Sequence, residues 1–151
     1  MKRVLFVLIL AASMLSACAA PGDIEVHQPW ARAAMTGENS AVYMELHNHS
    51  DQADDLVGAS SDIAAAVEIH LSSMNIEGMM QMVRQDSIPL SADAEIQFAP
   101  GGLHIMLVGL TRDLKAGDHF QVTLHFKTHA DIVLDVVVQT MEGMDMSTHM
   151  P

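Results

Sequence analysis

Cysteine is almost absent from this 151-residue sequence, which contains Cys18 and no other. A lone cysteine cannot form a disulfide within the chain, so the packed core must supply the stability. Basic residues are also few, with seven Lys and Arg against 19 Asp and Glu and a formal net charge of −12. A surface of this sign argues against nucleic-acid binding and against docking on anionic lipid by charge.

Catalytic signatures are missing as well. The sequence has no H-E-x-x-H segment, no nucleophile elbow and no phosphate-binding loop, so we expect the protein not to be an enzyme. Long apolar runs are missing too, because the run at residues 4–10 is too short to cross a bilayer as a permanent helix.

The first residues have the pattern of an export signal. Two basic residues precede the apolar run, and small residues then lead to Leu-Ser-Ala-Cys at 15–18, which resembles a bacterial lipobox. This pattern predicts a lipoprotein-type signal peptide at 1–17, a lipid anchor on Cys18 and a tether at 18–23. The alternative is an ordinary signal peptide cut near Ala20. The protein is thus expected in the periplasm, anchored to a membrane.

Residues 24–140 alternate between apolar and polar in short segments punctuated by glycine and proline, with almost no helical periodicity. The pattern is clearest at 120–127 and 132–138, and it recurs at 24–26, 40–48 and 67–71. Further short strands are predicted at 56–58, 79–84, 95–98 and 104–108. Roughly seven to nine short strands of this kind predict one all-β domain, an antiparallel sandwich or barrel.

Four side chains of this domain are candidate metal ligands. His104 and Met106 are two residues apart on a predicted strand, so they share a face at about 7 Å from one another. His70 lies on another predicted strand, and its side chain is expected on the opposite face from those of its apolar neighbours. Met82 follows the next turn. Thioether and imidazole together favour Cu(I) among the common metals. If the four converge, they form a neutral site for this soft ion.

The spacing of these residues resembles the H(M)-x10-M-x21-H-x-M motif of the periplasmic PCuAC copper chaperones. One residue and then ten separate His70 from Met82, 21 separate Met82 from His104, and one separates His104 from Met106. Leu71 stands where the motif often has a second methionine, and Met74 is a candidate accessory donor in its place.

The resemblance covers residues 24–138, through segments such as Trp-Ala-Arg at 30–32 and Leu-Lys-Ala-Gly-Asp at 114–118. It implies a cupredoxin-like β fold of Greek-key topology. It also implies a copper chaperone that delivers Cu(I) toward cytochrome c oxidase assembly, with oxidase subunit II or Sco-type proteins as partners. Two alternatives stay open: a copper-buffering lipoprotein without a dedicated acceptor, and an interaction protein whose methionines and histidines are incidental.

Residues 141–151 predict a flexible tail rich in methionine and histidine. We interpret this tail as a second, weaker copper site that accepts Cu(I) or Cu(II). Its candidate ligands are His149, Met141, Met144, Met146 and Met150.

The remaining histidines and methionines receive structural interpretations. His47 and His49 form an H-x-H pair that we assign to the decoration of a turn, and Met79 and Met80 we assign to the core or its rim. Three further histidines are expected on polar faces or in turns: His119, His125 and His129.

Overall fold

The computed structural model describes residues 24–140, which form ten β-strands and no helix. No helix among these residues is long and apolar enough to cross a membrane. The strands are β1 (Ile24–Arg32), β2 (Ser40–Asn48), β3 (Asp54–Ser60), β4 (Ala64–Met74), β5 (Met80–Gln85), β6 (Ile88–Leu90), β7 (Glu95–Phe98), β8 (Leu103–Leu110), β9 (His119–Phe126) and β10 (Ile132–Gln139). The all-β prediction is confirmed.

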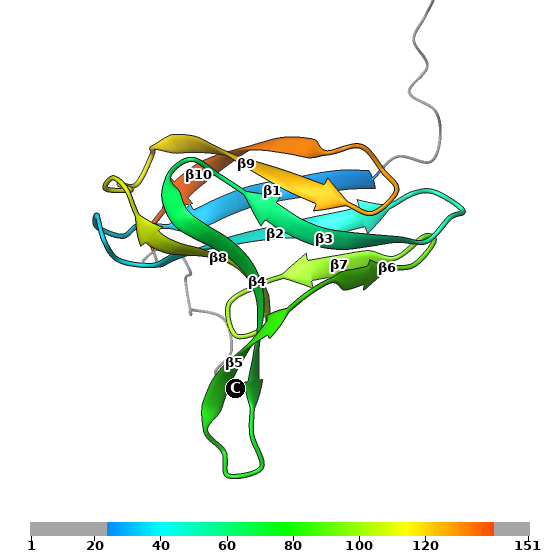
Figure 1. Cartoon of the computed structure of the whole chain (residues 1–151), viewed down its shortest axis with the longest axis horizontal. Helices are drawn as coiled ribbons and strands as arrows, with labels where there is room; N and C mark the ends of the chain where they lie inside the picture. Colours follow the sequence, from blue (N-terminus) through cyan, green and yellow to red (C-terminus); the bar gives the residue numbers. More distant parts are fainter. Residues whose placement is uncertain (1–23, 141–151) are drawn as a thin grey trace, which may run out of the picture.

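All ten strands belong to one hydrogen-bonded sheet in the order β5-β4-β8-β7-β2-β1-β10-β9-β3-β6, with a further pairing of β8 to β2. The sheet folds over on itself, so that its strands enclose a core (Figure 1). Most pairings are antiparallel, but β1 pairs with β10 and β7 with β8 in parallel. Strands β1 and β10 are neighbours although they are the first and last strands described, so the sheet joins segments far apart in the sequence.

Alternation along the last two strands builds one wall of the core. On β9 every second residue from Phe120 to Phe126 is buried, and β10 places Val136 opposite Phe120 in the antiparallel register. Residues two apart on a strand share a face, so the apolar set points inward together. Each such side chain stabilises the fold by roughly 1.5–3 kcal/mol on burial.

Strand β2 differs from the sequence-based expectation because its first half is buried on both faces. Val42 and Met44 point into the core as predicted, but Ala41 and Tyr43 are buried too. The Trp30 ring of β1 packs on Tyr43, with 4.6 Å between ring centroids. The alternation of apolar and polar residues in β2 predicts one solvent-exposed face, but in the structure neighbouring side chains cover the first half of that face.

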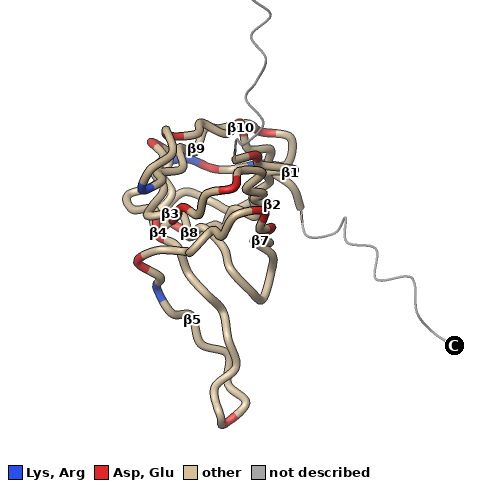
Figure 2. Tube along the Cα trace, turned by 90° about the vertical axis from the view of Figure 1, so that its right-hand side faces the viewer, with Lys and Arg blue, Asp and Glu red and all other residues tan. Residues whose placement is uncertain are grey.

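The ends of β4 and β5 project from the body of the molecule as a hairpin (Figures 1 and 2). Its turn begins at Asn75, whose side-chain oxygen accepts hydrogen bonds from the backbone N–H groups of Glu77 and Met79. Gly78 has φ +78°, a left-handed conformation that glycine adopts without strain. Glu77 is the only charged residue between residues 71 and 83, and acidic groups elsewhere are spread over the body (Figure 2).

Candidate metal centre

The register between β4 and β8 places two of the predicted ligands face to face. His70 on β4 is the direct cross-strand partner of His104 on β8. Direct partners in an antiparallel pair point to the same side of the sheet. Their ring centroids are 5.8 Å apart, and the rings meet edge to face.

The two predicted methionine ligands flank this histidine pair on the same face. Met106 lies two residues beyond His104 and opposite Ala41 of β2. Met82 on β5 faces Ser72, which makes it a diagonal neighbour of His70 at about 7–8 Å between backbones. Three strands, β4, β5 and β8, therefore bring the four side chains to one region of the surface.

A pocket of about 240 Å³ opens there. It is lined by His104, Met106 and Met82, together with Met80 and groups from β1, β2 and the β7–β8 turn. His70 does not line this pocket, although its ring contacts that of His104. His104 is 4% exposed while Met82 is 60% exposed, so the pocket has a buried imidazole on its inner side and a solvent-exposed thioether on its outer side.

The turn before β8 fixes the tautomer of His104. Gly101 has φ +82°, and the Gly102 carbonyl is 3.0 Å from His104 Nδ1. A carbonyl oxygen only accepts, so Nδ1 carries the proton and donates it. In the neutral ring Nε2 then holds the lone pair. The same carbonyl also accepts the backbone N–H of Ser72, which ties the turn to β4.

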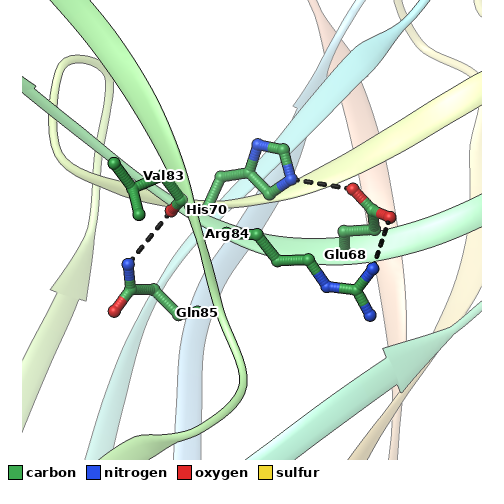
Figure 3. Close-up of polar contacts among 5 residues, drawn as sticks. All are labelled: Glu68, His70, Val83, Arg84 and Gln85. Carbon is green, nitrogen blue, oxygen red and sulfur yellow. Dashed lines mark hydrogen bonds and ion pairs between the residues drawn. The ribbon is translucent and has the colours of Figure 1, made fainter.

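A carboxylate fixes His70 in the complementary way (Figure 3). Glu68 Oε2 lies 2.8 Å from His70 Nε2, and Glu68 Oε1 accepts from Arg84 of β5 at 2.9 Å. The ionised carboxylate accepts, so Nε2 carries the proton and Nδ1 has the lone pair. Nδ1 is buried and is the one side-chain nitrogen or oxygen atom in the described part of the chain that is buried without a hydrogen-bond partner.

An unpartnered buried nitrogen normally costs about 1–3 kcal/mol, and such atoms mark strain or a binding function. A ring whose second nitrogen is held by a carboxylate is the usual arrangement of a metal-binding histidine. Both histidines therefore present a free lone pair while the other nitrogen is anchored. This donor set fits a soft cation, with two imidazoles and two thioethers available.

Sequence reasoning missed the aromatic side of the site. The Tyr43 ring stands 6.4 Å from the His104 ring and 4.6 Å from Trp30. Tyr43 therefore lies between the Trp30 and His104 rings, and both Tyr43 and His104 line the pocket. Strand alternation placed Tyr43 on the same face as the polar residues of β2, but only the β2–β8 register shows that this face meets His104.

The family described as "Putative lipoprotein LpqE-like" matches residues 24–138. The chain belongs to this family. It is also 37% identical over 125 residues to an uncharacterized protein of Rickettsia prowazekii (strain Madrid E), a match that covers 78% of this chain and 68% of the relative.

Solved structures similar to this LpqE-like chain are PCuAC domains. The copper-bound PCuAC domain from PmoF2 has a TM-score of 0.66 and 30% identity, covering 80% of this chain and 96% of that one. The Cu(I) form of DR1885 from Deinococcus radiodurans has a TM-score of 0.55 and 30% identity, with 85% of each chain covered. The resemblance to the PCuAC family and the cupredoxin-like fold are thus confirmed.

The other methionine predictions have separate outcomes in this LpqE-like domain. Met74 lies opposite Met80 at the end of β4, about 13 Å along the strand from His70, and it does not line the pocket. Met79 and Met80, predicted to lie in the core or at its rim, are 56% and 63% exposed, so neither lies in the core. Met80 instead lines the pocket and adds a thioether that the spacing did not single out.

Several predictions fall outside the described residues. They are the signal peptide at 1–17, the lipid anchor at Cys18, the tether at 18–23 and the tail at 141–151 with its candidate ligands Met141, Met144, Met146, His149 and Met150.

Proposed function

We propose that this protein binds copper as Cu(I) through His70, Met82, His104 and Met106 and acts as a copper chaperone. The observation that supports this most strongly is the pair of facing imidazoles, each with one nitrogen anchored and one lone pair free. In this assignment His70 binds through Nδ1 and His104 through Nε2. The copper-bound relatives of the same fold support the metal.

The donor chemistry suits an ion that must be released again. Thioethers and neutral imidazoles are soft to borderline donors that stabilise Cu(I). A cysteine site in an oxidising compartment would be vulnerable to disulfide formation, which thioethers avoid. The exposed Met82 stands at the mouth of the pocket, where an acceptor can compete for the ion first at the sulfur side.

We place the protein in the periplasm as a membrane-anchored lipoprotein. The proposal is supported by the lipobox-like sequence ending at Cys18 and by the family description, which names lipoproteins. A lipid on Cys18 would hold the acidic domain at a membrane without a spanning helix.

We further propose that the copper is delivered toward assembly of cytochrome c oxidase, with oxidase subunit II or a Sco-type protein as the exchange partner, and that the protein has no catalytic activity. The competing proposal is copper buffering, in which the same site sequesters the ion. Whether the ion is delivered or sequestered depends on the acceptor protein and not on the copper ligands, so both proposals use the same residues.

A deletion strain separates delivery from buffering. For a chaperone, cytochrome c oxidase activity falls at limiting copper and recovers when copper is added or when the wild-type chain is restored, but not with His70→Gln. For a buffer, oxidase activity is unchanged at limiting copper while growth becomes sensitive to excess copper. The second pattern would contradict delivery and leave the binding site itself untouched.

Glu68 should act as a positioning residue for His70. Glu68→Gln removes the charged acceptor that holds the ring and also its ion pair with Arg84. Loss of such a partner typically weakens metal binding about 10–100-fold, and we expect a Cu(I) affinity change in this range with the bound stoichiometry unchanged. A competition titration with a Cu(I) chelator measures it.

Glu77→Gln, at the exposed tip of the same hairpin, is the matched control and should leave the Cu(I) affinity unaltered. Equal affinities for Glu68→Gln and the wild type would show that the carboxylate does not orient the ring.

For the tail we propose a second, weaker copper site around His149, Met141, Met144, Met146 and Met150, with Cu(I) or Cu(II) as its ion. A flexible segment of the kind that the tail composition predicts loses conformational freedom on binding, which lowers affinity. Deleting residues 141–151 should remove this weaker equivalent and leave the tight one.

A further inference from the structure

A second group of metal-ligand side chains lies where β1 begins and β2 ends. Glu25 and His27 are two apart on β1 and share a face, and His49 follows directly after β2. Glu25 Oε2 is 3.4 Å from His27 Nε2 and 3.2 Å from His49 Nε2. The three ligand atoms all lie within 4.8 Å of one another.

The β1–β2 register explains why these side chains meet. Glu25 is the cross-strand partner of His47, two residues before His49. The His47 and His49 rings are in contact, with 3.8 Å between centroids and a tilt of 39°, so His47 packs against the His49 ring beside the carboxylate. The H-x-H pair is therefore part of a cluster, and its assignment to turn decoration was incomplete.

This cluster is distinct from the Cu(I) site. Met106 pairs with Ala41 near the start of β2, whereas His47 lies six residues further along the same strand. Six residues of an extended strand span about 20 Å. None of the three cluster residues lines the copper pocket.

We propose that Glu25, His27 and His49 bind a divalent cation of borderline softness, Zn(II) or Cu(II). Two imidazoles and one carboxylate, with no thioether among them, are the donors that these ions prefer and that Cu(I) does not. Water would fill the remaining coordination positions.

The distances agree with this assignment. Zinc–nitrogen and zinc–oxygen bonds of about 2.0–2.1 Å in a tetrahedron place neighbouring ligand atoms about 3.3 Å apart. The two measured separations to the Glu25 oxygen are 3.2 and 3.4 Å. Two of the three ligand-atom separations thus already match metal-binding spacing, and the third is no more than 4.8 Å. The His49 Nε2 is hydrogen-bonded to the Glu25 carboxylate, which also lies beside His27, so one carboxylate oxygen holds both rings near the place an ion would occupy.

Charge and access favour a cation here as well. The Glu25, His27 and His49 side chains are 57%, 49% and 41% exposed, so an ion reaches them directly from solvent. Glu45 is the cross-strand partner of His27, and Glu95 is that of His47. Three carboxylates on this stretch of sheet make the local potential negative and raise the local cation concentration.

Titration of the full chain with Zn(II) tests the site. His27→Gln/His49→Gln should bind one Zn(II) fewer than the wild type, because both imidazole donors are removed. The tail is present in every chain, so its contribution cancels in the comparison.

The control is His119→Gln/His125→Gln. His119 is exposed and His125 partly exposed, and each ring is bonded to a carboxylate, at 2.9 Å to Asp135 and 2.8 Å to Asp131. Among the described residues, neither pair belongs to a group of three metal-ligand side chains. This control should retain the full Zn(II) count.

A second variant guards against an indirect effect on folding. Glu25→Gln keeps the shape of the side chain and should weaken Zn(II) binding at least about tenfold. A Zn(II) count in the double variant equal to that of the wild type, or a Glu25→Gln affinity equal to that of the wild type, overturns the proposal. Cu(I) affinity should be unaltered in all these chains, so the outcome is independent of the copper site.

Discussion

A chain carrying His104→Gln should bind Cu(I) at least about a hundredfold more weakly than the wild type. Removing a partner of a metal ligand already costs about 10–100-fold, and His104 is proposed as a ligand itself. It is 4% exposed, its Nδ1 is held by the Gly102 carbonyl, and its ring faces His70. No other histidine pairs with His70 in the β4–β8 register, so no second imidazole among the described residues takes its place opposite His70.

His119→Gln is the control for this experiment, because His119 is exposed on β9 and hydrogen-bonded to Asp135. It should leave the Cu(I) affinity at the wild-type value. Competition with a chelator of known affinity measures both chains under the same conditions. An affinity for His104→Gln within a factor of about three of the wild type would remove this residue from the site.

Phe98→Ala should lower the free energy of unfolding by about 3–5 kcal/mol. Phe98 is 2% exposed and lies opposite Met44, while its parallel partner is Leu103, the residue before His104. Truncating a buried ring loses its transfer free energy and leaves a cavity that a close-packed core fills only in part. Against a total stability of about 5–15 kcal/mol for a typical protein, the loss is large.

Urea unfolding of the full chain at neutral pH measures this change. Val133→Ala is the control, because Val133 on β10 is 59% exposed, and it should cost less than about 1 kcal/mol. Equal midpoints for Phe98→Ala and the wild type would mean that the β7–β8 contact is not part of the cooperative core.

Periodicity was sufficient to predict most of this fold. Strands β9 and β10 alternate cleanly because each has one face on the core and one in water, so apolar spacing reports their burial directly. Strand β6 was missed because Ile88–Leu90 is three residues long with a proline at its centre, too short for any period. The parallel pairing of β1 with β10 could not be predicted from the local sequence pattern either, since it joins segments about a hundred residues apart.

The candidate site was predicted in its residues but not in its arrangement. Motif spacing indicated the four ligands, and alternation placed His70 on the side away from the core. The register that sets His70 opposite His104, and the contacts of each ring with Glu68 and Gly102, depend on tertiary packing. The cluster of Glu25, His27 and His49 was not recognised for the same reason. Glu25 and His27 lie on β1 and His49 follows β2, so only the pairing of these two strands brings them together.

The central claim, a Cu(I) ion held by two imidazoles and two thioethers on this face, is tested most directly by X-ray absorption at the copper edge. The full chain loaded with one equivalent of Cu(I) should show both nitrogen and sulfur neighbours. In Met82→Leu/Met106→Leu, a nearly volume-conserving change, the sulfur contribution at one equivalent should fall and the affinity should drop. A wild-type spectrum without sulfur, or an unchanged spectrum and affinity in the double variant, would contradict the account.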